Sequence, residues 1–279
     1  MPEAINGEVT IHYLDEGTGE AVLLIHGHTQ DRRIFDPMMG SLIGEGLRVI
    51  RPDLRGHGKS TRPDSGYHHS HHASDMLAVL DAADVHRASV VGYSVGGAIA
   101  LEMAITHSDR VAGLVLASPV MPDRPFEPEF MDCIRQVARV ARTEGIVAAM
   151  EGAWGECPLF THSFTKAGIR EAAEAITRDF PGAEYLATAR DHIERTWTIP
   201  ERLSEIDVPT IVLAGDSETS GFIDYAKEAA AGIPGSRLEL LVDCGHLLPL
   251  EEPDRVAQAI IDVAQTDDPN ATQPISIRP

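Results

Sequence analysis

The sequence predicts an α/β fold with a mostly parallel central sheet, and three features of its 279 residues support that prediction. Short apolar segments rich in β-branched residues alternate with longer segments that have helical periodicity. Several of the short segments are apolar without alternation, as expected for strands covered on both faces. The hydrophobic content of 43% is sufficient for a full core. Together these features favour strand–helix–strand units with right-handed crossovers.

The expected strands share a short apolar run, and the expected helices share apolar positions spaced three and four residues apart. In chain order, strands are expected at residues 9–14, 21–25, 48–51, 88–93, 111–117, 210–214 and 237–242. The helices that connect them are expected at residues 34–43, 70–83, 94–106, 222–231 and 253–264. Both sets together predict a core unit that consists of residues 1–120 and 205–265.

Residues 121–204 interrupt this alternation, because they contain several helical patterns and no convincing strand. They include both tryptophans and five of the seven phenylalanines. We therefore expect a helical insertion with an apolar face of its own. The final residues, 266–279, are polar and aperiodic, and we expect them to form a loose tail. One helical face of the insertion would carry Phe130, Ile134, Val137 and Val140.

The charge balance excludes several classes of partner. The chain has 23 Lys and Arg against 43 Asp and Glu, a formal net charge of −20, and no run of basic residues. Nucleic acids and anionic membranes require clustered positive charge, so neither is an expected partner. No stretch reaches the roughly 18 apolar residues of a membrane-spanning helix. Residues 1–6 also lack the pattern of a signal peptide.

The three cysteines are expected to be free thiols. Cys133, Cys157 and Cys244 form no Cys-x-x-Cys pair and no even-numbered framework. Free thiols are typical of a reducing compartment. Together with the missing signal-peptide pattern, this predicts a cytoplasmic protein whose partner is a small molecule. The sequence leaves the oligomeric state open.

The strongest chemical signal is the motif Gly-x-Ser-x-Gly at residues 92–96, between an expected strand and an expected helix. On such a sharp turn, a Cβ at Gly92 or Gly96 would collide with neighbouring backbone. The turn exposes the Ser94 hydroxyl and directs the helix N-terminus at it, which favours developing negative charge. Ser94 is therefore the candidate nucleophile.

A serine hydroxyl is a weak nucleophile and requires a base, which in this motif class comes late in the chain. His246 fits this role, because it lies between the last expected strand and the last expected helix. An oxyanion hole additionally needs backbone N–H groups near the serine. Val95 is expected to supply one of them, directly after Ser94. His28 is expected to supply the other, from the loop that follows an early strand.

These motifs, taken in this order, resemble the α/β-hydrolase superfamily. The resemblance is to the branch that contains serine esterases and 3-oxoadipate enol-lactonase-like hydrolases, and it spans most of residues 7–264. It implies a helical cap between the sixth and seventh core strands, which corresponds here to residues 121–204. The segments that carry the resemblance are His26-Gly27, residues 53–60, residues 92–97, Gly245-His246 and residues 251–253.

The resemblance also implies a catalytic acid three residues after Gly215. Glu218 occupies that position, where relatives usually carry aspartate. Asp216 is the rival, with the usual residue type at an unusual place, and Asp123 is the next alternative. We favour Glu218, because the position of a residue in the loop fixes the direction in which its side chain points. The additional methylene of glutamate changes only how far the carboxylate reaches. The acid would hold the tautomer of His246 and stabilise its imidazolium form.

Ser94 excludes the relatives that use an aspartate nucleophile, the haloalkane dehalogenases and epoxide hydrolases. The loop at residues 26–29 lacks the patterns of haloperoxidases, proline iminopeptidases, carbon–carbon bond hydrolases and lipases. The expected reaction is hydrolysis of a carboxylic ester or lactone through an acyl-enzyme, with no metal and no organic cofactor. The alternatives are carbon–carbon bond hydrolysis or perhydrolysis on the same triad, and a hydrolase-like ligand-binding or sensing protein.

Two aromatic residues of the cap are expected to line the substrate pocket. Trp154 and Phe160 lie in an irregular segment around Gly155 and Pro158, where side chains are less committed to a helical core. An apolar chamber over the active site would follow from their position.

Two groups of histidines are assigned structural positions. His57 lies in the 53–60 loop, which we interpret as a structural turn where Asp53 and Arg55 form local ion pairs. Residues 68–72 contain four histidines, which we interpret as a solvated helix start. They would face different directions on a helix, and no acidic or cysteine ligand joins them at a spacing typical of metal sites.

Overall fold

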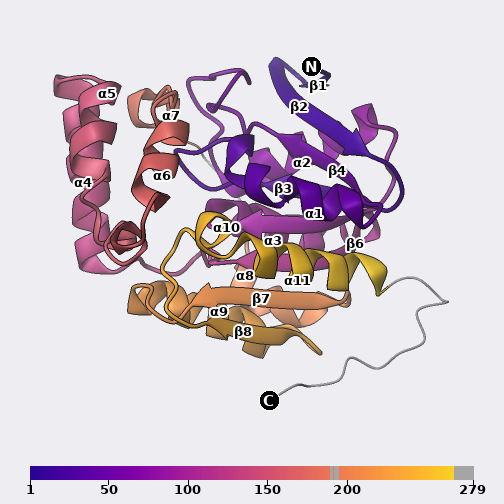
Figure 1. Cartoon of the computed structure of the whole chain (residues 1–279). Coiled ribbons are helices and arrows are strands. Elements are labelled where there is room, and N and C mark those ends of the chain that lie inside the picture. Colours follow the sequence, from indigo (N-terminus) through magenta and orange to yellow (C-terminus); the bar gives the residue numbers. More distant parts are fainter. Residues whose placement is uncertain (189–190, 192–194, 267–279) are drawn as a thin grey trace.

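Eight strands form one central sheet in the computed structural model of the chain, which describes residues 1–188, 191 and 195–266 (Figure 1). The order across the sheet is β1-β2-β4-β3-β5-β6-β7-β8. The last six strands in this order, β4, β3, β5, β6, β7 and β8, run parallel to one another. The predicted α/β fold with a mostly parallel sheet is therefore confirmed. The strands are β1 (Glu3–Asn6), β2 (Val9–Gly17), β3 (Ala21–Ile25), β4 (Arg48–Pro52), β5 (Ala88–Tyr93), β6 (Val111–Ala117), β7 (Thr210–Gly215) and β8 (Arg237–Leu241).

The middle of the sheet differs from its first edge. Strands β3, β5, β6 and β7 are almost entirely buried, which explains why their sequences are apolar without alternation. Strand β2 begins with alternating burial and pairs antiparallel with both β1 and β4. The sequence prediction omitted β1, because only Ala4 of its four residues is buried and no apolar run marks it.

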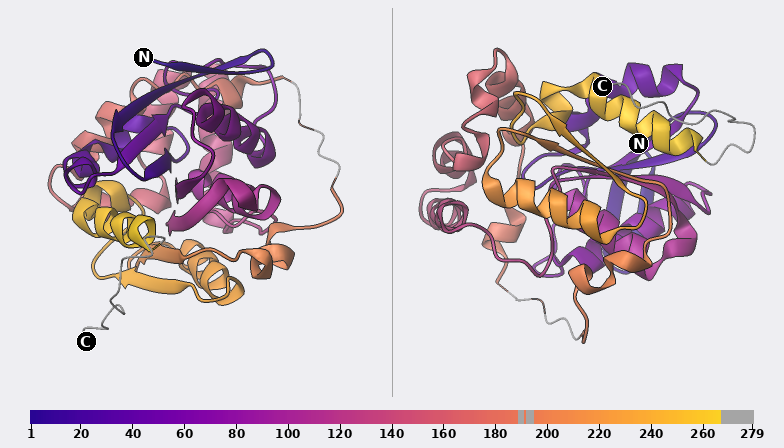
Figure 2. Two further views of the ribbon diagram at one scale, coloured as in Figure 1. Left: turned by 90° about the vertical axis from the view of Figure 1, so that its right-hand side faces the viewer. Right: turned by 90° about the horizontal axis from the view of Figure 1, so that it is seen from below.

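Helices cover both faces of the sheet (Figure 2). Helices α1 and α11 pack together on one face, and α2 and α3 pack together on the other. All five predicted core helices are present, although the first divides into a 3-10 segment, η1, followed by α1. These elements are η1 (Arg32–Met38), α1 (Met39–Gly44), α2 (His69–Ala82), α3 (Val95–Thr106), α9 (Ser220–Gly232) and α11 (Pro253–Gln265). The short helix α10 (Leu248–Glu251) was not predicted.

The chain between β6 and β7 contains the 16-residue helix α4, several shorter helices and, within its described residues, no strand. Figure 1 shows α4 to α7 gathered at one end of the sheet. Helix α4 buries Phe130, Val137 and Val140 on one face, with Ile134 partly buried beside them, as the periodicity predicted. The elements are α4 (Pro128–Thr143), α5 (Ile146–Ala149), η3 (Met150–Trp154), η4 (Pro158–Phe160), η5 (Ser163–Thr165), α6 (Ile169–Thr177), α7 (Ala183–Leu186), α8 (Ile199–Arg202) and η6 (Leu203–Glu205).

The expectation of three free thiols is wrong for two of them. Cys133 on α4 and Cys157 between η3 and η4 form a disulfide, with their Cα atoms 5.7 Å apart. Only Cys244 is a free cysteine, and it is buried. Packing of α4 against η3 brings the two sulfur atoms together. The two cysteines are 24 residues apart, and this spacing matches no sequence motif from which the disulfide could have been predicted. The prediction of a reducing compartment, which depended on three free thiols, therefore loses this support.

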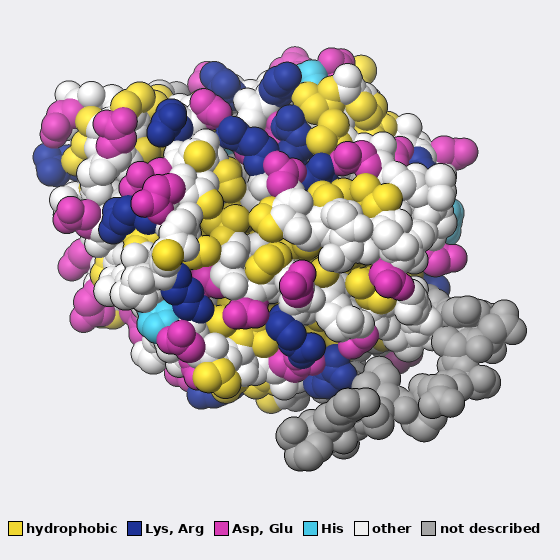
Figure 3. Space-filling model, in the orientation of Figure 1, with side chains coloured by type: hydrophobic (Ala, Val, Ile, Leu, Met, Phe, Trp, Pro, Cys, Tyr) yellow, Lys and Arg dark blue, Asp and Glu magenta, His cyan; other side chains and the backbone are white. Residues whose placement is uncertain are grey.

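The surface drawn in Figure 3 mixes acidic and basic side chains rather than separating them. Asp and Glu are distributed over the whole face, with Lys and Arg interspersed among them. Within the described residues, no helix is long and apolar enough to cross a membrane. Residues 267–279, which make up nearly all of the predicted tail, lie outside the described part of the chain.

Candidate active site

The candidate nucleophile lies on the turn between β5 and α3. Ser94 has φ 54° and ψ −117°, a conformation that non-glycine residues rarely adopt. The flanking glycines permit this turn, as predicted from the motif. A Cβ on Gly92 would lie 2.3 Å from the Gly96 carbonyl oxygen, and one on Gly96 would lie 2.1 Å from the Ile25 carbonyl oxygen. The turn therefore presents the Ser94 hydroxyl where α3 begins.

His246 lies directly against this serine. It is buried in the loop between β8 and α10, and its Nε2 is 3.0 Å from Ser94 Oγ. The Phe222 ring of α9 packs edge-on against the imidazole, with 4.6 Å between ring centroids. Packing of this kind fixes the imidazole plane, so that one ring nitrogen faces the serine and the other faces away from it.

Glu218 is the carboxylate that reaches the other imidazole nitrogen. Its Oε1 lies 3.2 Å from His246 Nδ1, and the same oxygen accepts a hydrogen bond from the Ser118 hydroxyl. Asp216 instead accepts a hydrogen bond of 2.8 Å from the Asp243 backbone N–H, in the turn that leads to His246. Of the two rivals at the end of β7, the structure brings Glu218 to the imidazole.

Asp123, the remaining alternative acid, is engaged elsewhere. Its Oδ2 lies 2.5 Å from the Arg195 guanidinium and accepts a hydrogen bond of 3.0 Å from the Ile199 backbone N–H. These contacts connect the end of β6 with the segment that leads into α8. Asp123 therefore anchors one end of the cap to the core and is not a partner of the imidazole.

The loop after β3 lies beside the nucleophile. A Cβ on Gly27 would be only 3.1 Å from Ser94 Cβ, so a glycine is needed for the loop to pass so close. Neither His28 nor Val95 donates a backbone hydrogen bond to another described residue. Both N–H groups thus satisfy one requirement of an oxyanion hole, which is that its donors are not already used.

His26 holds this loop in place. Its Nε2 accepts a hydrogen bond of 2.9 Å from the Leu54 backbone N–H, and its Nδ1 lies 2.8 Å from the Gly27 carbonyl oxygen. Burial lowers the pKa of His26, which favours the neutral ring that these contacts require. The loop that carries His28 is therefore tied to the loop that follows β4.

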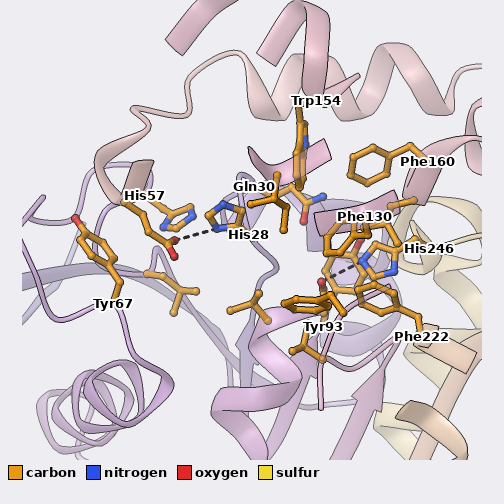
Figure 4. Close-up of a pocket in the computed structure, with 18 of the residues that line it drawn as sticks. His28, Gln30, His57, Tyr67, Tyr93, Phe130, Trp154, Phe160, Phe222 and His246 are labelled. Atoms are coloured by element: carbon orange, nitrogen blue, oxygen red, sulfur yellow. Dashed lines mark hydrogen bonds and ion pairs between the residues drawn. The ribbon is translucent and has the colours of Figure 1, made fainter. Parts of the chain in front are cut away.

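Ser94 and His246 open into a cavity of about 170 Å³ (Figure 4). We call one part of it the aromatic end, formed by Phe126, Phe130, Trp154, Phe160 and Phe222. Trp154 and Phe160, the two side chains expected from the sequence, pack edge to face at 5.2 Å between centroids. This end is apolar and lies next to the His246 ring.

The other part of the cavity, which we call the polar end, is formed by His28, His57, Tyr67, His72, Glu184 and Tyr185. His28 connects the core with the cap, since its Nε2 lies 3.0 Å from the Tyr185 hydroxyl and its Nδ1 lies 3.2 Å from Glu184. Burial raises the pKa of Tyr185, so its phenol stays protonated. Figure 4 shows His57 and Tyr67 on the side of the cavity opposite His246.

Two structural assignments of histidines require correction. His57, which we assigned to a structural turn, lines the polar end, and so does His72, which we expected in a solvated helix start. Burial lowers the pKa of both imidazoles well below their usual value, so they are neutral near pH 7. The position of His72 was available from helical periodicity, because Met76 and Val79 share its buried face of α2.

The expected ion pairs of the 53–60 loop are present. Asp53 pairs with Arg32, and Arg55 pairs with Asp75 at 2.6 Å. His69 of the neighbouring histidine cluster lies 3.2 Å from Glu102 on α3. These contacts hold the loop and the start of α2 against the core. The polar end of the cavity is therefore built on well-anchored backbone.

Comparisons with known proteins agree with this architecture. Residues 20–253 match a family model described as the alpha/beta hydrolase fold. The chain is 29% identical over 262 residues to AB hydrolase superfamily protein YisY of Bacillus subtilis (strain 168), covering 90% of this chain and 94% of that protein. It is 28% identical over 275 residues to 2-hydroxymuconate semialdehyde hydrolase of Pseudomonas putida, covering 88% of this chain and 87% of that protein.

A solved structure shows a similar likeness. The structure of Est816, described as an N-acyl homoserine lactone degrading enzyme, matches with a TM-score of 0.74 and 29% identity. The match covers 92% of this chain and 98% of that one. At this coverage, most of the sheet and of the intervening helical segment have counterparts in that enzyme.

Proposed function

The chain belongs to the alpha/beta hydrolase fold family, and we propose that it is a serine hydrolase that cleaves a carboxylic ester or lactone. One observation carries the proposal: Ser94, His246 and Glu218 form a continuous series of contacts of 3.0 Å and 3.2 Å. A hydroxyl, an imidazole and a carboxylate in this order form the arrangement that activates serine in acyl transfer.

In the proposed mechanism, His246 Nε2 takes the proton of Ser94 as Oγ attacks the carbonyl carbon of the substrate. Glu218 Oε1 accepts the hydrogen bond from Nδ1–H, which selects the tautomer with a free Nε2 and stabilises the imidazolium that forms. The Ser118 hydroxyl donates to the same carboxylate oxygen and so helps to hold the acid in position.

The negative charge of the tetrahedral intermediate would lie near the N-terminus of α3. The backbone N–H groups of His28 and Val95 are the proposed donors to this oxyanion. Removing one such donor in other serine hydrolases reduces kcat by about 10²–10³. His246 then gives its proton to the leaving alkoxide oxygen, and an acyl group remains on Ser94.

Water completes the proposed reaction. His246 takes a proton from a water molecule, whose oxygen attacks the acyl carbon. The second tetrahedral intermediate then collapses, the bond between Oγ and the acyl carbon breaks, and His246 returns the proton to Oγ, which releases the acid and restores the Ser94 hydroxyl. The aromatic end of the cavity would hold the apolar part of the substrate and restrict access of bulk water. Each proton and each bond in this sequence is accounted for by the three side chains and water.

The likeness to Est816, which degrades N-acyl homoserine lactones, supports the lactone form of the proposal. The likeness to 2-hydroxymuconate semialdehyde hydrolase favours a second candidate, hydrolysis of a carbon–carbon bond on the same three residues. The two reactions differ in the leaving group, which is an alkoxide in one and a carbanion equivalent in the other. A parallel assay with a chromophoric dienoate substrate separates them.

A hydrolysis screen tests the proposed function. Purified protein would be assayed against esters of increasing acyl length and against lactones, with Ser94→Ala as the control. We expect turnover that depends on Ser94, together with stoichiometric labelling of Ser94 by a fluorophosphonate. Turnover that persists in Ser94→Ala would contradict the mechanism. No turnover with tight binding of a small ligand would favour a sensing protein instead.

A further inference from the structure

Gln30 is a buried polar side chain that the proposed mechanism does not use. It lies two residues after His28, lines the cavity and is only 4% exposed. Its Oε1 has no hydrogen-bond partner in the described part of the chain. Figure 4 places Gln30 between His28 on one side and the side chains around His246 on the other. Buried acceptors normally have a donor, so this one calls for an explanation.

The carboxamide lies close to the nucleophile. The position that a Cβ on Gly27 would take is 2.8 Å from Gln30 Oε1 and 3.1 Å from Ser94 Cβ. Both atoms therefore border the same small space beside the reacting group. In an acyl-enzyme, a substituent on the carbon next to the carbonyl is four bonds from the serine Cβ, which brings it within reach of this acceptor.

Tyr93 lines the same cavity as Gln30. Burial raises the pKa of the Tyr93 phenol well above its usual range, and the Gln30 side chain opposes that rise. The Tyr93 hydroxyl has no hydrogen-bond partner in the described part of the chain, so it does not pair with Gln30, and the Gln30 carbonyl oxygen stays unpartnered.

The imidazoles of His57 and His28 do not need a ligand in the same way. His57 donates from Nδ1 to the Arg55 carbonyl oxygen at 3.0 Å and accepts at Nε2 from the Thr29 backbone N–H at 3.3 Å. His28 is likewise engaged at both ring nitrogens by Tyr185 and Glu184. Among the described side chains, Gln30 provides the carbonyl oxygen without a partner that lies beside the nucleophile.

We propose that Gln30 selects substrates that carry a hydrogen-bond donor, a hydroxyl or an amide N–H, on the carbon next to the reacting carbonyl. This inference rests on the proposed function and narrows it to esters and lactones of α-hydroxy or α-acylamino acids. The donor would complete the hydrogen bonding of Gln30 Oε1, while the apolar part of the substrate occupies the aromatic end.

Two esters that differ in this donor test the proposal. Methyl mandelate has an α-hydroxyl, and methyl α-methoxyphenylacetate has the same oxygen without its hydrogen. We expect kcat/KM to favour the hydroxy ester by about tenfold, a usual effect for one hydrogen bond in a buried site. The ratio of Kd values for the two esters, measured by calorimetry on Ser94→Ala, should show the same preference without turnover.

Variants of Gln30 assign the preference to this side chain. Gln30→Met keeps the length of the side chain but lacks the acceptor oxygen. The ratio of kcat/KM values and the ratio of Kd values for the two esters should therefore both fall to about one. Gln30→Glu keeps an acceptor oxygen and should retain the preference, and thermal melting of both variants checks that they fold. Ratios near one in the wild type, ratios unchanged in Gln30→Met, or failure of both esters to bind would overturn the proposal. Binding preference without any hydrolysis would refute the esterase function and leave the subsite standing.

Discussion

The core half and the cap half of the cavity are built in different ways. Ser94, His246 and Glu218 each follow a strand of the sheet, and hydrogen bonds or a constrained backbone fix each of them. Trp154 and Phe160 lie on the short helical turns η3 and η4, where apolar packing holds them. The side chains of the core half are thus positioned by hydrogen bonds, which are directional. Those of the cap half are positioned by apolar packing, which has no preferred direction.

This difference has a consequence for what each half tolerates. Directional contacts define atom positions to within a fraction of an ångström, which proton transfer requires. Apolar packing adapts to side chains of similar volume at modest cost. Substitutions in the core half should therefore abolish turnover, whereas substitutions in the cap half should change which substrate is preferred.

The largest effect is expected from the two residues that exchange the proton. Ser94→Ala and His246→Ala should each reduce kcat by about 10⁴-fold or more, and the double variant should lose little beyond that, because the residues act as a unit. Steady-state kinetics with a short-chain chromogenic ester measures this. Additive losses in the double variant would contradict a shared step.

The next largest effect should separate the two acids at the end of β7. Glu218→Gln should reduce kcat by roughly 10²–10⁴ while the fold is retained, because the amide no longer selects the reactive tautomer of His246. Asp216→Asn is the matched control, since Asp216 bonds the Asp243 backbone instead. If Asp216→Asn were the inactive variant and Glu218→Gln nearly normal, the assignment would be reversed.

The disulfide offers a test that acts on the cap alone. Cys133→Ala should lower the free energy of unfolding by about 3 kcal/mol, as chain-entropy models give for a loop of this length. Cys133 and Cys157 are 24 residues apart. Thermal melting with and without reductant should show a shift in the wild type and in Cys244→Ala, but none in Cys133→Ala. Titration of three free thiols in the unfolded, unreduced protein would contradict the pairing.

The buried histidines of the core half predict a pH dependence of stability. Burial lowers the folded-state pKa of His57 and His72, so the unfolded chain binds more protons than the folded one below about pH 6.5. Stability is fully present above that pH and is lost as the pH falls, by at most about 1.4 kcal/mol per pH unit for each histidine.

The variant His72→Leu should reduce this loss between pH 7 and pH 5, as measured by melting temperature. His86→Gln is the control for removal of an exposed imidazole. An unchanged pH dependence in His72→Leu would mean that other groups cause it.

The smallest effect is expected from the cap aromatics. Trp154→Phe and Phe160→Leu should change the ratio of kcat/KM between short and long acyl chains by about threefold to tenfold, with little change in melting temperature. Both side chains line the aromatic end. Unfolding of the variants with an unchanged preference in the remaining enzyme would show that these rings only form the interior of the cap.

The sequence was most informative where structure depends on neighbours in the chain. The alternation of apolar runs with helical periodicity determined the parallel sheet, because strands buried on both faces are mostly apolar. The spacing of Gly92, Ser94 and Gly96 indicated the sharp turn, because the collision that excludes a Cβ on Gly92 is with the backbone of Gly96 in the same turn. The packed face of α4 followed in the same way from its periodicity.

Tertiary structure alone decided which distant groups meet. The choice between Glu218 and Asp216 depended on where the His246 loop returns, and both residues suit a loop at the end of a strand. The Cys133–Cys157 disulfide likewise arises from how α4 packs against η3 within the cap, and the unpartnered Gln30 oxygen arises from how one loop passes the nucleophile. These contacts join residues that are separated along the chain. Periodicity and motif spacing carry information only about residues that are close in sequence, so they could not predict these contacts.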